Sequence, residues 1–98
     1  MANFTTRVEL HQATYQDYEN LHAAMGMAGF SRYITSDDGT VYHLPTAEYD
    51  RSANLQRSEI LDQAKAAANS TGKANAVIVT EANGRTWQGL VKVEGRRS

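Results

Sequence analysis

The sequence predicts an α+β domain with a ferredoxin-like βαββαβ fold, a two-layer sandwich of one antiparallel sheet and two helices. Three observations predict it. Apolar and polar residues alternate near the start of the chain, two later segments have apolar residues at helical spacing, and Asp37-Asp38-Gly39 is a hairpin signal between them. Because strand–helix–strand crossovers are right-handed, both helices should cover the same face of the sheet.

The part of the chain before the hairpin contains the first strand and the first helix. From Phe4 to His11 every second residue belongs to one face, which is typical of a strand with one buried side. Thr14, with Asp17 three residues later, resembles a capping box. We therefore expect a helix over Tyr15–Ala28, ended by Gly29 in a left-handed conformation.

The hairpin itself should join two strands that pair with each other. Phe30–Thr35 and Thr40–Leu44 are rich in β-branched and aromatic residues on either side of the turn. Pro45 has no amide hydrogen to donate, so the second of these strands should end there. The following residues, Thr46–Asn54, mix alternation with loop-forming residues and are expected only to be extended.

The second half of the chain repeats the helix–strand order. Ser58 is expected to cap a helix that continues to Ala68. The apolar run in Ala74–Glu81 predicts a strand buried on both faces, and Asn83-Gly84 predicts a hairpin to an extra C-terminal strand over Thr86–Val93. Residues 94–98 should form a flexible tail.

Composition limits the classes of function. Ninety-eight residues are enough for one domain, so residues 1–98 are expected to form a single unit. The chain has no cysteine, no export signal and no apolar run of the length needed to cross a bilayer, which favours a cytoplasmic protein without a membrane partner. A net charge of -1 excludes a general basic surface for nucleic acid and leaves only a local patch.

The histidines are the first candidates for chemistry. The predicted topology brings His11, at the end of the first strand, close to His43, after the hairpin. Two imidazoles that titrate near neutrality can move protons to and from a ribose 2′-hydroxyl and a leaving 5′-oxygen, and so cleave RNA. A histidine that ends a strand is more often merely hydrogen-bonded. His22 flanks the apolar stripe of the first helix, where a boundary residue is the simpler interpretation.

A divalent cation is the alternative source of chemistry. Glu9, Asp37 and Asp38 supply the hard oxygen ligands that such ions prefer, although aspartates in turns usually serve the backbone. No motif with recognised metal spacing and no glycine-rich phosphate loop is present. The sequence therefore predicts no metal ligand set, and any cofactor is unknown.

Aromatic and basic residues are candidates for RNA contact. Tyr49 and Trp87 offer ring faces for an unpaired base, although such residues are more often core or dimer contacts. The arginines that are candidates for phosphate contact are Arg7, Arg32, Arg51, Arg57 and Arg85.

A spacing of residues in the middle of the chain resembles a known family. The residues are Met25, Gly29-Phe30-Ser31, Gly39, Leu44, Tyr49, Leu55, Ser58-Glu59-Ile60 and Asp62. In this spacing the sequence resembles the GhoS-like endoribonuclease antitoxins of type V toxin–antitoxin systems. The resemblance implies a ferredoxin-like fold similar to that of small CRISPR-associated nucleases, and cleavage of the messenger RNA of a membrane-active toxin. It places the family's basic helix position on His22, its aromatic position on Tyr49, and its acidic first-strand position nearest His11.

The resulting hypothesis is a small antitoxin endoribonuclease that acts on single-stranded RNA. His22 and Tyr49, with Arg32, would bind RNA, and His11, His22 or His43 would move protons. The residues leave open whether the protein is an enzyme. The alternatives are a non-catalytic homodimeric interaction module and a module that binds RNA without cutting it.

Overall fold

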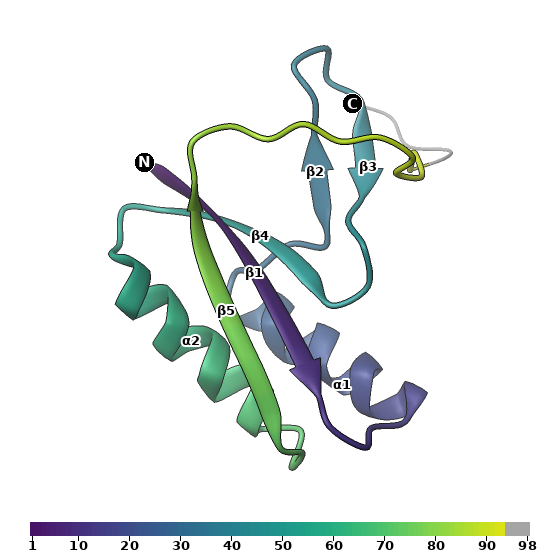
Figure 1. Cartoon of the computed structure of the whole chain (residues 1–98), viewed down its shortest axis with the longest axis vertical. Coiled ribbons are helices and arrows are strands. Elements are labelled where there is room, and N and C mark those ends of the chain that lie inside the picture. The colour runs from purple at the N-terminus through teal and green to yellow at the C-terminus, as the bar shows by residue number, and fades with distance from the viewer. Residues whose placement is uncertain (94–98) are drawn as a thin grey trace.

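Residues 1–93 are described by a computed structural model of the chain, shown in Figure 1. Residues 94–98, for which the sequence predicts a tail, lie outside the described residues. The elements in chain order are β1 (Ala2–Leu10), α1 (Tyr15–Met27), β2 (Tyr33–Thr35), β3 (Val41–His43), β4 (Glu48–Ala53), α2 (Arg57–Asn69) and β5 (Asn75–Ala82).

The strands form two antiparallel sheets. The larger has the order β4-β1-β5, and β2 pairs only with β3 in a separate hairpin. This order is consistent with a ferredoxin-like fold, but the prediction of one continuous sheet is wrong. The hairpin projects beyond the larger sheet and joins it through a bridge between Ser31 and Asp50, with N–H···O distances of 2.8 and 2.7 Å.

The strand beside β1 is β4, which the sequence predicted only as extended chain. We expected the hairpin strands in this place. Alternation explains why β4 fits there, because Tyr49 and Ala53 are buried on one face while Ser52 is exposed on the other. The predicted alternation of β1 is confirmed, since Phe4, Thr6 and Val8 are buried, whereas Thr5 and Arg7 between them are not.

Both helices pack on the same face of the larger sheet, as predicted. Leu21 of α1 and Ile60 of α2 are fully buried and belong to one core with Phe4 of β1. Figure 1 shows the two helices side by side behind the strands. The alanines of α2 keep this layer thin, because a small side chain lets helix and sheet approach closely.

The N-terminal ends of both helices are fixed by hydrogen bonds between side chains and backbone amides in the first turn. The Thr14 hydroxyl accepts from the Asp17 amide at 3.2 Å, and the Asp17 carboxylate accepts from the Thr14 amide at 2.9 Å, which confirms the capping box. The second helix begins at Arg57 with Gln56 as its N-cap, so the prediction that Ser58 caps this helix is wrong. Its start is stabilised by Glu59, whose carboxylate accepts from the Gln56 amide at 2.9 Å.

Two predictions for the C-terminal third are wrong. Strand β5 lies at the edge of the sheet with one open face, so Ile78 is 62% exposed rather than buried on both sides. After Gly84 the chain does not return along β5 but crosses to the hairpin, where the His43 amide donates to Val91 and the Val93 amide to Val41. The expected extra strand is therefore a bridge to β3 at Lys92.

Among residues 1–93, no helix is both long enough and apolar enough to cross a membrane.

Replacing Gly29 by alanine is expected to lower the free energy of unfolding by about 1–3 kcal/mol. Gly29 has φ +95°, and an added Cβ would lie 3.1 Å from Cζ of Arg51. The measurement is urea unfolding followed by circular dichroism. Gly39→Ala is the matched control, because Gly39 has φ +86° with nothing within 4 Å of an added Cβ. Equal losses in the two variants would show that the Arg51 contact adds nothing to the backbone strain.

Candidate functional site

A polar contact between helix α1 and strand β4 joins His22 to Tyr49. His22 Nδ1 lies 2.7 Å from the Tyr49 hydroxyl oxygen, and the ring centroids are 5.9 Å apart. His22 comes from α1, one residue after the buried Leu21, and Tyr49 comes from the helix-facing side of β4. The tyrosine ring thus fills the core, and its hydroxyl meets a half-buried imidazole at the margin of that core.

The surroundings keep both groups of this pair uncharged. Burial, and secondly the positive charge of Arg32, lowers the pKa of His22, while Glu19 opposes this shift. Burial likewise raises the pKa of Tyr49 well above its usual range, although Arg32 opposes the shift. A neutral imidazole beside a protonated phenol is therefore the state of the pair at neutral pH.

Stability is expected to fall as the pH is lowered from 7.5 to 5.5, because of His22. Its folded-state pKa is below the ordinary 6.5, so below pH 6.5 the unfolded chain binds a proton that the folded chain does not. Proton uptake by the unfolded state lowers the free energy of unfolding, and stability is regained as the pH rises. The measurement is the melting temperature across this range, and His22→Asn should flatten the dependence. The same slope in wild type and variant would contradict the prediction.

The pair can be arranged in two ways, because either partner can donate. When the Tyr49 hydroxyl donates to Nδ1, the neutral ring carries its proton on Nε2. When Nδ1–H donates to the hydroxyl oxygen, the lone pair of Nε2 is left to accept a proton. In the second arrangement Nε2 of His22 is able to accept a proton while Tyr49 holds the ring in place.

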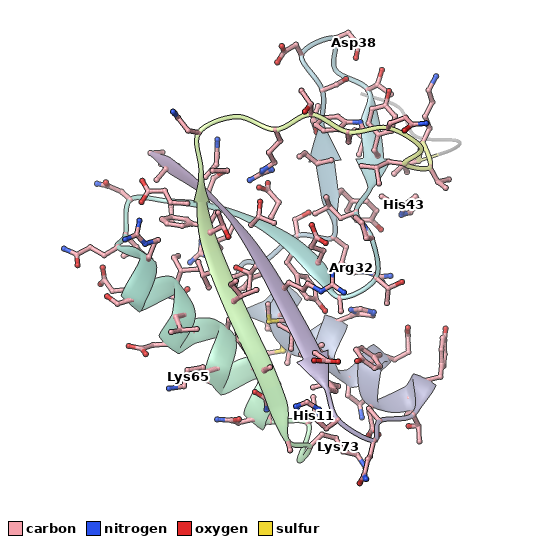
Figure 2. All side chains as sticks on the ribbon, in the orientation of Figure 1. His11, Arg32, Asp38, His43, Lys65 and Lys73 are labelled. Carbon is pink, nitrogen blue, oxygen red and sulfur yellow. The ribbon has the colours of Figure 1, made fainter. Side chains whose placement is uncertain are left out.

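The structure brings three predicted residues together and separates the other two. Arg32, an exposed residue between Ser31 and β2, lies close enough for its charge to act on both His22 and Tyr49. His11 and His43 are exposed at different places: Figure 2 shows His11 at the end of β1 and His43 at the end of β3, in the hairpin. The expected proximity of His11 and His43 is wrong, because β3 is not a strand of the larger sheet. His43 instead packs its ring on Tyr33, at a centroid distance of 5.2 Å.

The carboxylate alternative is also wrong. Within residues 1–93, no three histidine, cysteine, aspartate or glutamate side chains lie close enough together to hold a metal ion. Glu9 is near the end of β1, whereas Asp38 is at the tip of the hairpin, far from that end in Figure 2. Asp38 serves the turn, where its carboxylate accepts from the Thr40 amide at 2.9 Å and from the Ser36 hydroxyl.

Tyr49 cannot stack on an RNA base, although the sequence made it a candidate for this contact. Its side chain is fully buried, so neither ring face is open to an unpaired base. Its contribution to the site is therefore the hydroxyl group and not the ring. Trp87 is partly exposed and packs at a centroid distance of 5.5 Å and an angle of 67° against Tyr42, which leaves it as the aromatic candidate for stacking.

Sequence reasoning missed the partners of two arginines. Arg51 packs over Phe30 and donates to Oε1 of Gln63 at 3.0 Å, so it is a packing residue. Arg85 donates to Oδ1 of Asp50 at 2.6 Å, and both side chains are largely buried. No local signal could have found this pair, because 35 residues separate its members and only the crossing segment brings them together.

No protein-family model matches the chain. No curated protein matches it either. The resemblance to GhoS-like antitoxins therefore stays a prediction.

Proposed function

We propose that this protein is a small cytoplasmic endoribonuclease that cleaves single-stranded RNA and acts as an antitoxin on the messenger RNA of a toxin. We also assign its fold to the ferredoxin-like class, with the hairpin as an insertion before the strand that pairs with β1. The observation that carries the proposal is the contact of His22 with Tyr49 beside the charge of Arg32. This combination offers a neutral base, a group that orients it and a cation for phosphate.

The reaction follows from these three groups. Arg32 binds a phosphodiester oxygen, which places the ribose 2′-hydroxyl near His22. Nε2 takes the 2′-hydroxyl proton, the 2′-oxygen attacks the phosphorus, and the bond to the 5′-oxygen breaks. The imidazolium returns the proton to that oxygen, which leaves a 2′,3′-cyclic phosphate and a 5′-hydroxyl end. Tyr49 is a positioning residue, since it contacts His22 and not the substrate.

The acidic net charge of the chain agrees with a weak and brief encounter with RNA. The formal charge is -1, so no general attraction holds a polyanion on the surface. The lowered pKa of His22 also means that its imidazole adds no charge at neutral pH. Phosphate binding at this site is therefore assigned to Arg32, whose charge acts on His22.

The test is incubation of purified protein with a labelled single-stranded RNA, with and without EDTA. Cutting that persists in EDTA and leaves cyclic phosphate ends is the expected result. Intact RNA in every lane would overturn the proposal, and cutting that EDTA abolishes would overturn the role given to His22. A double-stranded RNA of the same sequence is the control for the single-strand preference.

A homodimeric interaction module is the second candidate, and the free edge of β5 favours it. Among residues 1–93 no strand pairs with the outer side of β5, and Ile78 is 62% exposed on its open face. An exposed edge strand can pair with the same strand of a second copy. Light scattering at increasing concentration would detect such a dimer, which Ile78→Lys should weaken.

A further inference from the structure

A cleft opens between the hairpin and the segment that follows β5. Its volume is 740 Å³, which is enough for a ligand of nucleoside size. The β2–β3 hairpin forms one side, and residues 84–87 form the other, where the chain crosses above β1 and β4 in Figure 1. The mechanism proposed above uses none of the side chains in this cleft.

The walls of the cleft combine aromatic rings with carboxylates. Trp87 and Tyr33 line it, and both are partly exposed. Asp37 and Asp50 contribute carboxylates, and Arg85 contributes a guanidinium held by Asp50 at 2.6 Å. The buried Nε of Arg85 has no hydrogen-bond partner among residues 1–93.

The charges of the lining argue against phosphate as the ligand. Two carboxylates face one guanidinium, so the cleft is net negative and repels an anion. A flat uncharged ring with several N–H donors fits better, because aromatic walls stack on it and carboxylates accept hydrogen bonds from its N–H groups. Among the nucleobases, guanine presents the adjacent donors N1–H and N2–H₂ to a carboxylate and the acceptors O6 and N7 to an arginine.

The cleft also lies next to the His22 site, because two backbone segments contribute residues to both. Ser31 and Asp50 line the cleft and form the bridge between hairpin and sheet. The next residue after Ser31 is Arg32, and the residue before Asp50 is Tyr49, and these two belong to the His22 site. Each of the two bridged segments thus contributes one residue to the cleft and one to the proposed cleavage site.

We propose that this cleft binds an unpaired guanine base of single-stranded RNA and so selects where the strand is cut. The inference rests on the proposed function for its role in cleavage, but the binding of guanine does not depend on it. Trp87 or Tyr33 stacks on the base, a carboxylate accepts from its Watson–Crick edge, and the strand continues over the bridge toward Arg32.

The binding test uses the fluorescence of Trp87, the only tryptophan in the chain. Guanosine should change it saturably, and inosine, which lacks the 2-amino group, should bind about 5- to 150-fold more weakly. Asp37→Asn and Asp50→Asn should reduce this difference, and Asp62→Asn, on the exposed side of α2, is the matched control. No saturable change with guanosine, or equal binding of guanosine, inosine, adenosine and uridine, would overturn the proposal.

Cleavage of two short RNAs, one with a single guanosine and one with none, separates this inference from the proposed function. Faster cutting of the first RNA, near its guanosine, supports both. Equal cutting of the two RNAs would overturn guanine selection by the cleft, but it would still support the proposed endoribonuclease activity. Saturable guanosine binding without any cutting supports the guanine cleft and overturns the endoribonuclease.

Discussion

Tyr49→Ala is expected to lower the free energy of unfolding by about 3–5 kcal/mol. Tyr49 is among the largest fully buried side chains of the chain, and its ring shares the core with residues of both helices and of β1. Its removal takes away apolar contacts and leaves a cavity that the surrounding side chains fill only in part. Urea unfolding followed by circular dichroism would measure the loss.

Tyr49→Phe is the control that separates packing from the hydroxyl. This variant keeps the ring and loses the 2.7 Å contact to His22, so it should cost only about 0.5–1.5 kcal/mol. A loss with phenylalanine as large as that with alanine would show that the hydroxyl, and not the ring, supports the core. Because small domains have a total stability of about 5–15 kcal/mol, Tyr49→Ala is best studied below room temperature.

His22→Asn is expected to slow RNA cleavage by about 10²- to 10⁴-fold while the fold is retained. The side-chain amide of asparagine reaches the position of Nδ1 and can still bond the Tyr49 hydroxyl, but it cannot take a proton at the position of Nε2. The rate should be measured under single-turnover conditions, together with the melting temperature, so that a loss of activity is not confused with unfolding.

His11→Asn and His43→Asn are the comparison variants for His22. Both residues are exposed and neither belongs to the His22 site, so neither replacement should change the cleavage rate. If either of these variants lost activity while His22→Asn kept it, the role of general base would have to be assigned to that histidine and not to His22. Arg32→Gln should weaken RNA binding with little effect on stability, because the Arg32 side chain is exposed.

Local patterns predicted the elements that depend on near neighbours. The alternation of β1 and the Thr14–Asp17 capping box both act over a few residues, and both are confirmed. The two helices were expected close to where they lie, α1 ending at Met27 and α2 beginning at Arg57. Patterns of this kind are reliable because one face of each element must be buried whatever it packs against.

The pairing of strands could not be predicted in the same way. The Asp37-Asp38-Gly39 turn does form a hairpin, but β4 takes the place beside β1 that the hairpin strands were expected to fill. Either a strand of the hairpin or β4 could pair with β1 at this edge, and long-range packing determines which of them does. Tyr49 favours β4, since its large ring is fully buried in the core when β4 pairs with β1.

In the candidate site, too, the sequence predicted individual residues, whereas long-range packing decided which of them meet. Tyr49 was singled out from its residue type and His22 from the resemblance to GhoS-like antitoxins, but 27 residues separate them, and only the packing of α1 on β4 brings them within 2.7 Å. The pairing of His11 with His43 was expected from an assumed topology, and it failed with that topology.

By itself, the sequence determined the helices, the buried face of the first strand, the hairpin turn and the residue types from which a site could be made. Only the tertiary structure decided that β4 lies beside β1, that the C-terminal segment crosses to the hairpin, and that Asp50 meets Arg85. The physical reason is the range of the forces involved. Hydrogen bonds within a turn are set by adjacent residues, whereas the choice of strand partners depends on which arrangement buries the most apolar surface across the whole chain.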